Sequence, residues 1–386
     1  MKILFVTRGF PSDGDPMDGN YEAVQAKAIA AKGHEVSVIG IHYRNMTQIF
    51  KMGRVRHRVV DGVHVYECTR MHLYNPIINS FWVKRKILQF QFRQVFKKYL
   101  KEMGMPDIVH AHIVLWALPA ICVKTEFHLP FVITEHWSKM FEDVIPKRIL
   151  EKTFAYQYAD RVICVSDVLA EHLRRYCNVQ SVVIRNMVAN HFFDKIKEKS
   201  NSGGFKFIAV GNLLEIKRYD LLIEAFASCN FPEDVVLNIV GEGSDRPLFE
   251  KKIKDCQVER QVKLLGVKTP EEVSDLLCHS DCFTLSSRLE TFSIALIEAM
   301  AKGLPVIATK CGGPETFVRP EDGLLVEKEN VQEFAKAMKY MMTHYQDYDG
   351  EEIRQHCHDN FSQDVIADKI ISIYQDVIDN SKQQND

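Results

Sequence analysis

The sequence predicts an α/β protein made of two doubly wound, Rossmann-like domains. Short strands rich in Val and Ile alternate with helical stretches, which is typical of a parallel sheet covered by helices on both faces. This succession occurs twice, and a charged stretch rich in Ser, Asn and Gly at residues 192–204 separates the two occurrences. A chain of 386 residues also exceeds the size that one core usually supports. We therefore place the domains at residues 1–190 and 191–364, and a C-terminal helix, about 365–386, could pack back on the first domain.

The individual strands follow from short runs of β-branched and aromatic residues bounded by turn-forming residues. In the first domain they are expected at residues 2–7, 35–41, 63–66, 107–111, 131–134, 161–165 and 181–184. In the second domain they are expected at residues 206–210, 235–240, 262–265, 282–285, 306–308 and 323–326. After Asn330 the chain should be helical to its end, apart from a break near Asp349-Gly350. Two such domains would place the carboxyl edges of their sheets across a cleft, and closure of that cleft excludes water.

The composition is that of an ordinary globular protein, with 46% hydrophobic and 26% charged residues. The first residues lack the long apolar stretch of a signal peptide, and no apolar run reaches the roughly 18 residues of a transmembrane helix. The ten cysteines are scattered without zinc-binding spacing, so we expect reduced thiols in a cytoplasmic protein. Residues 1–186 carry a net charge of +9 and the remainder −11, which implies different partners for the two halves.

Two glutamates eight positions apart lie in the most informative stretch of the chain, residues 287–309. Glu290 stands in a turn that leaves the strand 282–285, and Glu298 lies inside the helix that follows. Ser293 is placed to cap this helix, Gly303 can end it, and Pro305 prevents its continuation. In a parallel sheet such a strand–turn–helix unit brings the positive end of the helix dipole to the carboxyl edge.

This edge suits a ligand that has both phosphate and hydroxyl groups. Either glutamate alone could be solvated or could only complement the helix dipole. The next strand, however, ends in a similar turn, Gly312-Gly313-Pro314-Glu315, which is expected to open another helix at the same edge. Carboxylates beside an anion site of this kind favour a nucleotide sugar.

Dinucleotide-dependent dehydrogenases share this architecture, but their glycine motif is missing. The Gly-x-Gly-x-x-Gly sequence should follow the first strand of a domain. Neither Gly211-Asn212-Leu213 nor Gly9-Phe10-Pro11 provides it, and Gly241-Glu242-Gly243 is only a partial match.

With these motifs the chain resembles the retaining glycosyltransferases of family 4, which have the GT-B fold. Four ordered stretches carry the resemblance: Gly-Asn-Leu-Leu-Glu-Ile-Lys-Arg-Tyr-Asp-Leu-Leu-Ile-Glu-Ala-Phe at 211–226, Ile-Val-Gly-Glu-Gly at 239–243, the block of Glu290 and Glu298, and Cys-Gly-Gly-Pro-Glu followed by Asp-Gly-Leu-Leu-Val within 311–326. Residues 31–38 and Thr134-Glu135-His136 also match, so nearly the whole chain is covered. The resemblance implies transfer of a hexose from a nucleotide-diphosphate sugar to a glycan or lipid-linked acceptor, with retention at the anomeric carbon, in cell-surface polysaccharide biosynthesis.

The resemblance assigns catalytic roles to Lys217, Glu290 and His136. Lys217 matches the lysine that neutralises the donor diphosphate, and Glu290 matches the acid that contacts the transferred sugar. His136 matches a histidine near the C6 side of that sugar, although it could also be a structural residue at a strand end.

Other residues are expected to bind the donor or to face the acceptor. Glu298 matches the acid that accepts hydrogen bonds from the ribose hydroxyls. Asn212 stands where an arginine is usual, so Arg218 or backbone amides could carry more of the diphosphate, and Ser293 replaces a frequent glycine. The remaining expected residues are Gly211, Phe292, Ile294, Gly312, Gly313 and Glu315 for the phosphates and sugar, Gly266 and Val267 for the base, and Gly19 and Asn20 in the acceptor-side loop.

No metal or other cofactor is expected, and neither is a nucleic-acid partner. Asp13-Gly14-Asp15 and Asp347-Tyr348-Asp349 read Asp-x-Asp, the metal-binding signature of the other large glycosyltransferase fold, but neither ends a predicted core strand. Lys217 and helix dipoles would neutralise the diphosphate instead. Two other classes stay open: a nucleotide-sugar epimerase or hydrolase, and a non-catalytic scaffold, although the joint presence of Lys217, Glu290 and Glu298 argues against the scaffold.

Residues 81–104 form a predicted basic amphipathic helix. Lysines and arginines stand at 84, 85, 86, 93, 97, 98 and 101, while Leu88, Phe92, Val95, Phe96 and Tyr99 recur at helical spacing. This helix could simply dock on its own sheet with a solvated basic face. Alternatively, it could bind an anionic membrane, as a peripheral enzyme on the inner face of the cell membrane would.

Overall fold

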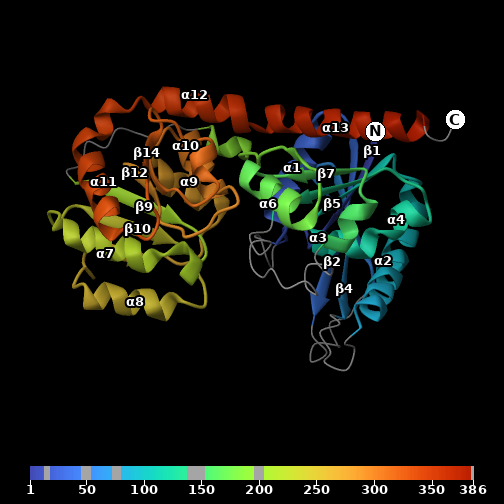
Figure 1. Ribbon diagram of the computed structural model, residues 1–386, viewed down its shortest axis with the longest axis horizontal. Coiled ribbons are helices and arrows are strands. Elements are labelled where there is room, and N and C mark those ends of the chain that lie inside the picture. The colour runs from blue at the N-terminus through green and yellow to red at the C-terminus, as the bar shows by residue number, and fades with distance from the viewer. Residues whose placement is uncertain (13–17, 45–53, 72–79, 137–152, 195–203, 384–386) are drawn as a thin grey trace. The chain divides into compact units, whose positions relative to one another are not determined.

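The structure is a computed structural model that describes residues 1–12, 18–44, 54–71, 80–136, 153–194 and 204–383 (Figure 1). Contacts divide the chain into two units. Unit 1 consists of Met1–Arg185 together with Ile366–Asp386, and unit 2 of Asn186–Val365. Each unit has one sheet, and each is described by itself below.

Unit 1 contains an eight-stranded sheet with the strand order β3-β4-β2-β1-β5-β6-β7-β8. The strands are β1 (Lys2–Thr7), β2 (Glu35–Arg44), β3 (Arg56–Val60), β4 (Val63–Met71), β5 (Ile108–His112), β6 (Phe131–Glu135), β7 (Arg161–Cys164) and β8 (Val182–Val183). Neighbouring strands pair in parallel, except β3 with β4. The described helices are α1 (Asn20–Ala31), α2 (Phe81–Met103), α3 (Val114–Ala120), α4 (Cys122–Thr125), α6 (Asp167–Cys177) and most of α13 (Gln363–Gln383). The strand order reverses direction between β1 and β5.

Unit 2 contains a six-stranded parallel sheet with the order β11-β10-β9-β12-β13-β14. The strands are β9 (Lys206–Val210), β10 (Val236–Val240), β11 (Val262–Leu264), β12 (Cys282–Leu285), β13 (Val306–Thr309) and β14 (Gly323–Val326). The helices are α7 (Tyr219–Cys229), α8 (Arg246–Asp255), α9 (Pro270–Cys278), α10 (Ile294–Ala301), α11 (Val331–His344) and α12 (Gly350–Phe361). If the strands are renumbered from the first strand of the unit, the strand order is 3-2-1-4-5-6. In sheets of this order ligands bind where the order reverses, which here is between β9 and β12.

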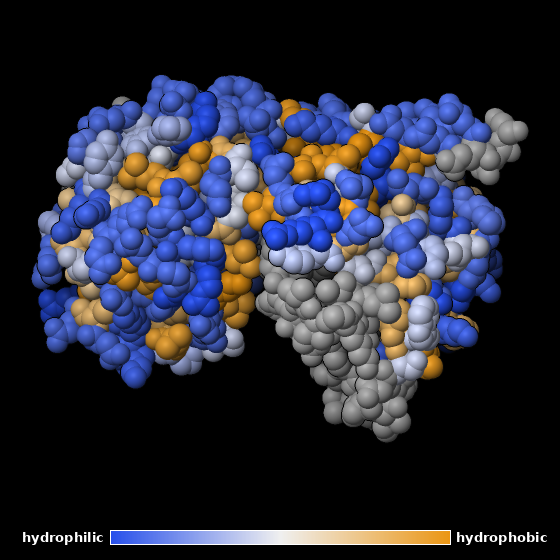
Figure 2. Space-filling view, viewed as in Figure 1, coloured by the Kyte–Doolittle hydropathy of each residue, from blue (hydrophilic) through white to orange (hydrophobic). Residues whose placement is uncertain are grey.

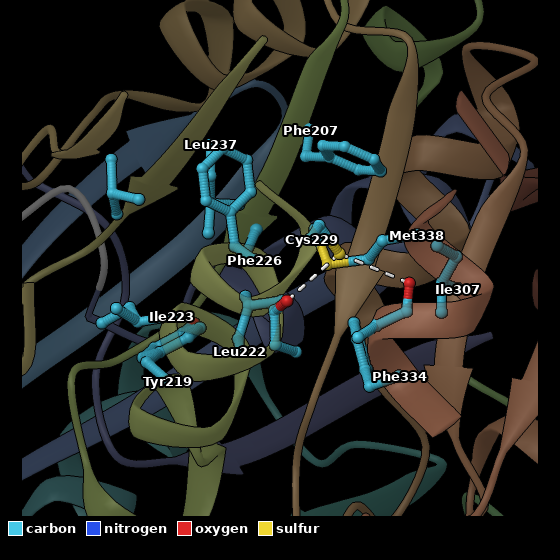
Figure 3. Packing of buried hydrophobic residues seen from close by; sticks show 14 of the residues in the cluster. Phe207, Tyr219, Leu222, Ile223, Phe226, Cys229, Leu237, Ile307, Phe334 and Met338 are labelled. Carbon is cyan, nitrogen blue, oxygen red and sulfur yellow. Dashed lines mark hydrogen bonds between the residues drawn. The ribbon is translucent and has the colours of Figure 1, made fainter. Parts of the chain in front are cut away.

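A hydrophobic core fixes the first helix of unit 2 on its sheet (Figure 3). Phe207 of β9, Phe226 of α7 and Phe334 of α11 are at most 1% exposed. The thiol of Cys229 donates to the carbonyl oxygens of Ala225 at 3.2 Å and Ala335 at 3.4 Å, so α7 is also tied to α11. Since each fully buried Phe contributes about 1.5–3 kcal/mol, this packing holds the loop between β9 and α7 in place.

The structure confirms two doubly wound, predominantly parallel sheets, and it differs from the sequence prediction in three places. The prediction missed β3, because its alternating charged residues lie at an exposed antiparallel edge. Ser293 occupies the N-cap position of α10, but its side chain makes no capping hydrogen bond and its φ is 80°. The Gly312-Gly313-Pro314 turn opens only a short 3₁₀ turn, η6 (Pro314–Thr316), because Phe317 turns back to pack on Phe292 with ring centroids 4.9 Å apart.

The ten cysteines are free thiols, and most of them are buried. Within the described part of the chain, no helix combines the length and the apolar character that crossing a membrane requires.

Candidate functional site

The site in unit 2 lies at the carboxyl ends of β9 and β12, the two strands between which the strand order reverses. These strands pair directly, with Phe207 opposite Cys282. The loop from β9 to α7 carries Lys217, and the loop from β12 to α10 carries Glu290. Two side chains that are 73 positions apart are thereby brought together.

Lys217 and Glu290 form a close ion pair. The Nζ of Lys217 lies 2.6 Å from Oε1 of Glu290, and the two side chains are 23% and 11% exposed. The hydroxyl of Ser287 donates to the same carboxylate oxygen at 2.7 Å, and the backbone N–H of Glu290 donates to the carbonyl of Cys311 at 3.0 Å. Glu290 is therefore held both through its carboxylate and through its backbone N–H. The ammonium group of Lys217 still has N–H donors for a further partner.

Gly211 leaves space beside this pair. A Cβ at Gly211 would lie 2.9 Å from the hydroxyl of Tyr219 and 3.9 Å from Nζ of Lys217. The ring of Tyr219 is 3% exposed and packs edge-on against Phe249, so the hydroxyl is fixed at the edge of the core. Burial raises the pKa of Tyr219, and the negative charge of Glu290 adds to this rise. The phenol thus stays a neutral hydrogen-bonding group beside the ion pair.

Backbone hydrogen bonds join the two loops. The hydroxyl of Ser286 donates to the carbonyl of Lys217 at 2.8 Å, and the N–H of Arg288 donates to the carbonyl of Ile216 at 2.8 Å. Thr309 at the end of β13 donates to the carbonyl of Ser287 at 2.6 Å. These contacts make the positions of Lys217 and Glu290 depend on each other.

The N-terminus of α10 offers backbone rather than side-chain groups. The side chain of Phe292 is buried in a cluster with Phe317 and Phe361, so only its backbone can face a ligand. Ser293, with φ 80° and ψ 90°, turns the chain into Ile294, the first residue of α10. A Cβ at Gly313 would lie 2.7 Å from the carbonyl oxygen of Phe292, so glycine is needed for the loop after β13 to approach Phe292.

The remaining predicted donor-binding residues of the β13 loop and of β11 lie at the same edge of the sheet. The N–H of Gly312 donates to the carboxylate of Glu315 at 2.8 Å, so this exposed carboxylate is engaged in its own loop. Gly266 follows β11, and its carbonyl accepts from the N–H of Gly241 at 2.9 Å. Val267 beside it is 63% exposed, as an apolar platform for a base would be.

Arg218, the residue that could supply the guanidinium that Asn212 lacks, has acidic partners of its own. Its side chain bonds Asp220 at 3.0 Å and forms an ion pair with Glu329, and it is only 16% exposed. Asn212 is exposed. The expectation that Arg218 or backbone amides take the part of the usual arginine stays a prediction. A diphosphate would have to draw this guanidinium away from Asp220 and Glu329.

Glu298 lies inside α10, where burial raises the pKa of its carboxyl group from 4.5 to about 7. A carboxyl group that titrates near neutral pH at a sheet edge is typical of functional sites. It can accept hydrogen bonds in either protonation state and can donate one when protonated.

The predicted residues of unit 1 form a separate group. His136 follows β6, and its Nε2 lies 3.1 Å from Nδ1 of His112, at the end of β5. Gly19 precedes α1, and Asn20 is the first residue of this helix. A Cβ at Gly19 would lie 2.2 Å from the carbonyl oxygen of Gly9, so Gly19 allows close contact with Gly9, which follows β1.

Sequence reasoning missed Ser287, Tyr219 and His112. His112 lies in no motif, and Ser287 and Tyr219 lie in the informative stretches without a role assigned to them, because each acts through a contact that only the folded chain creates. The position of Tyr219, two residues after Lys217 at the start of α7, is a signal that could have found it.

The described residues contain no group of three or more His, Cys, Asp or Glu side chains that could hold a metal ion. The side chain of Asp349 accepts from the N–H groups of Glu351 and Glu352 and caps α12, which gives the second Asp-x-Asp a structural role. Asp13 and Asp15 lie outside the described residues.

Two doubly wound sheets are the architecture of the GT-B fold. Solved structures support this fold over nearly the whole chain. The sucrose-phosphate synthase from Thermosynechococcus elongatus matches with a TM-score of 0.78 and 19% identity, covering 98% of this chain and 99% of that one. HepE from Anabaena, solved with UDP and glucose, matches with a TM-score of 0.73 and 18% identity, covering 97% and 99%.

The chain belongs to glycosyltransferase family 4. The family model "Glycosyltransferase Family 4" matches residues 22–190, and "Glycosyl transferases group 1" matches residues 191–364. An uncharacterized glycosyltransferase of Methanocaldococcus jannaschii is 29% identical over 250 residues, which are 61% of this chain and 65% of that protein, so the match spans less than two thirds of that relative.

Two further relatives match more of this chain. The GPI3 subunit of the phosphatidylinositol N-acetylglucosaminyltransferase of Saccharomyces cerevisiae is 27% identical over 79% of this chain and 67% of its own length. A Bacillus subtilis protein named for teichuronic acid biosynthesis, TuaC, is 26% identical over 88% of both chains. All of these relatives are named as glycosyltransferases, and so this chain is a glycosyltransferase.

The raised pKa of Glu298 predicts a pH-dependent stability. The folded protein keeps this proton up to about pH 7, whereas the unfolded chain loses it near pH 4.5, so unfolding releases a proton between these values. The contribution of Glu298 to the free energy of unfolding therefore falls as pH rises through this window. Glu298→Gln, which does not titrate, should become more stable relative to wild type by about 2–3 kcal/mol from pH 4.5 to 8.

Urea unfolding followed by circular dichroism at several pH values measures this difference. Glu321→Gln, at an exposed position of the same unit, is the matched control and should leave the pH dependence unchanged. If Glu298→Gln and wild type run parallel across the window, Glu298 is not held in a protonated state.

Proposed function

We propose that this enzyme transfers a hexose from a nucleotide-diphosphate sugar to a glycan or lipid-linked acceptor, with retention at the anomeric carbon. The observation that carries the proposal is the contact between Lys217 and Glu290 where the strand order of unit 2 reverses. A cation there can meet a diphosphate, and a carboxylate beside it can accept hydrogen bonds from sugar hydroxyls.

In the proposed reaction the bond between the anomeric carbon and the diphosphate breaks, and the acceptor oxygen bonds to that carbon on the same face. The proton of the acceptor hydroxyl passes to the departing phosphate. Lys217 exchanges part of its contact with Glu290 for the diphosphate and stabilises the negative charge that develops on it. Glu290 stays oriented by Ser287 and holds the transferred sugar.

The rest of the donor would occupy the same edge of unit 2. The backbone N–H groups of Phe292, Ser293 and Ile294 face the phosphates at the positive end of α10. Glu298 receives the ribose hydroxyls, and Gly266 and Val267 receive the base. Gly312, Gly313 and Glu315 line the sugar side. The similarity to HepE, solved with UDP and glucose, supports a nucleotide-sugar donor.

On the acceptor side, His136, Gly19 and Asn20 of unit 1 would contact the sugar and the incoming hydroxyl. The names of the relatives support a glycan or lipid acceptor, since one acts on phosphatidylinositol and another is assigned to teichuronic acid biosynthesis. These names favour a role in cell-surface polysaccharide biosynthesis. The proposal puts the enzyme on the cytoplasmic side of the membrane.

Product analysis separates this proposal from its alternatives. A transferase forms a glycosylated product only when the acceptor is present. An epimerase or hydrolase converts the donor without one, and a scaffold binds the donor without converting it. A thermal-shift screen against UDP-, GDP- and ADP-sugars identifies the donor to be used in this assay.

Lys217→Ala and Glu290→Ala should each reduce turnover by on the order of 10²–10³, equal to about 2.7–4 kcal/mol of transition-state stabilisation. The reason is that each removes a charge that contacts the diphosphate or the sugar in the transition state. Initial rates with the donor identified by the thermal-shift screen measure the effect.

Lys252→Ala is the matched control, because Lys252 is also ion-paired, with Glu224, and is 29% exposed on the surface of the same unit. It should retain wild-type turnover. Circular dichroism confirms that the variants are folded. A folded Glu290→Ala protein with near-wild-type turnover would remove Glu290 from the mechanism.

We further propose that transfer needs no divalent metal, because Lys217 and the end of α10 meet the charge of the diphosphate. Turnover should then persist in excess EDTA. Loss of activity in EDTA that Mg²⁺ or Mn²⁺ restores would contradict this and would point back to an Asp-x-Asp metal site, with Asp13 and Asp15 the first to mutate.

The surface of α2 supports a proposal about the membrane. Phe92, Val95, Phe96 and Tyr99 are buried, so the periodic apolar stripe belongs to the core of unit 1. The opposite face has an exposed stripe of its own, made of Trp82, Val83, Lys86, Phe90, Lys97 and Lys101. Figure 2 shows hydrophobic and hydrophilic residues side by side where Figure 1 places α2.

The basic side chains of this helix differ in the contacts that they make within the protein. Arg93 bonds Glu126, Lys98 lies 3.8 Å from Glu102, and Arg85 stacks on the rings of Trp82 and Phe154. Lys86, Lys97 and Lys101 are exposed on the outer face beside Phe90, which is 59% exposed. Aromatic residues beside lysines suit the surface of an anionic bilayer, with about 1 kcal/mol for each well-placed cation.

Replacing Lys86, Lys97 and Lys101 together by Glu should abolish co-sedimentation with anionic vesicles at low salt. The same triple change at Lys251, Lys254 and Lys263, exposed in unit 2, is the control and should leave binding intact. Absence of wild-type binding, or equal binding by the charge-reversed protein, would show that α2 has no membrane role.

A further inference from the structure

Three histidines of unit 1 lie in a row at the carboxyl ends of β5 and β6. His110 and His112, two positions apart on β5, point to the same face of the sheet and are at most 1% exposed. Their ring centroids are 4.3 Å apart, and His112 stacks on His136 with centroids 5.4 Å apart and an angle of 16° between the rings. We call these three residues the histidine row.

The first histidine of the row is fully hydrogen-bonded. Nδ1 of His110 lies 2.6 Å from the hydroxyl of Tyr374 on α13, and Nε2 lies 2.7 Å from the hydroxyl of Thr134 on β6. His112 has one such contact, from Nδ1 to Nε2 of His136 at 3.1 Å. The other nitrogen of His112, Nε2, is buried, and no described residue offers it a hydrogen bond.

Burial keeps the inner part of this row neutral. It lowers the pKa of His110 to about 3, and it lowers that of His112 well below the ordinary value of 6.5. The neighbouring histidines would add repulsion to any charge there. A neutral imidazole carries one N–H, so each ring must exist as one of two tautomers.

The unpartnered nitrogen decides between the tautomers of His112. A buried N–H without an acceptor is rarer in proteins than a buried acceptor without a donor. His112 therefore carries its proton on Nδ1 and donates it to Nε2 of His136. Because Nε2 of a neutral His136 then accepts, the proton of His136 must lie on Nδ1.

The neighbouring backbone is built to hold this geometry. Glu135 is fully buried, and its carboxylate accepts from the N–H groups of His136 and Val114, both at 3.0 Å, and from the hydroxyl of Tyr156 at 2.6 Å. Ile113, between His112 and Val114, has φ 65° and ψ 137°, which a β-branched residue adopts only under strain. Such strain persists where the surroundings enforce it, and it concentrates at functional sites.

We propose that His112 is a positioning residue that holds His136 as its Nδ1–H tautomer, so that His136 presents an N–H donor on Nδ1. The recipient would be an oxygen of the bound sugar, and this part rests on the proposed function of His136. Thr134 and Tyr374 hold His110 through hydrogen bonds, and the ring of His110 lies beside that of His112.

Long-range ¹H–¹⁵N correlation spectra of the full chain labelled with ¹⁵N-histidine read the tautomers directly. His136→Gln and His112→Phe spectra assign the two rings by subtraction. We expect both rings to carry the proton on Nδ1 in the wild type, and His136 to gain Nε2–H population in His112→Phe. An Nε2–H or doubly protonated His136 in the wild type would overturn the proposal.

Two further variants separate positioning from general damage. His112→Asn keeps a polar atom near the place of Nδ1 and should preserve the tautomer of His136. Tyr374→Phe removes a buried hydroxyl at the far end of the row and should leave His136 unchanged. If Tyr374→Phe shifts the tautomer as much as His112→Phe does, His112 has no specific role.

Activity then tests the link to catalysis. His112→Phe should lower kcat by on the order of tenfold, the effect of one lost hydrogen bond, with little change in donor KM, and His112→Asn should restore most of it. A shifted tautomer with unchanged kcat would leave the positioning role standing and would disprove the proposed contact of His136 with the sugar. An unchanged tautomer with reduced kcat would disprove the positioning role.

Discussion

The ion pair between Lys217 and Glu290 is the interaction on which the edge of unit 2 depends. The carboxylate of Glu290 is buried, and it needs partners because an unpaired buried charge is strongly destabilising. The pair joins a loop of β9 to a loop of β12, and the hydroxyl of Ser287 also donates to the carboxylate. Gly211, which has no side chain, lets the hydroxyl of Tyr219 lie beside the pair. A diphosphate that takes over the lysine would therefore leave Glu290 in place rather than release it.

Both units have a residue with positive φ immediately before a helix, at the point where their strand order reverses. In unit 2, Ser293 has φ 80° immediately before α10, which follows β12. In unit 1, Ile113 has φ 65° immediately before α3, which follows β5. A strained residue of this kind costs about 1–3 kcal/mol, so the surrounding contacts must enforce it. In unit 1 the N–H of Ile113 donates to Thr134 at 2.7 Å, and Glu135 binds the first N–H of α3. The strained backbone directs the N-terminus of each helix toward the sheet edge where the proposed ligands bind.

Most of the fold could be predicted from the sequence, because buried parallel strands form short Val- and Ile-rich runs and glycines end the helices. The strand β3 could not, because its pattern of charged residues also fits a loop. For the site, motif resemblance pointed to Lys217 and Glu290, which the structure brings into contact, but not to Ser287 or Tyr219, which contact them only in the folded chain. The ion pair of Arg218 with Glu329 could not be predicted for the same reason, since the two residues lie 111 positions apart in the sequence.

The two edges differ in the kind of polar group that they bury, so each edge by itself suits a different kind of ligand group. The edge of unit 2 holds charges and a helix N-terminus, which suit a diphosphate. The edge of unit 1 holds neutral imidazoles and the hydroxyls of Thr134 and Tyr374, because burial prevents His110 and His112 from gaining a proton. Neutral donors and acceptors bind hydroxyl groups but attract phosphate far less than a cation would. The uncharged edge of unit 1 therefore suits hydroxyl groups better than it suits a phosphate.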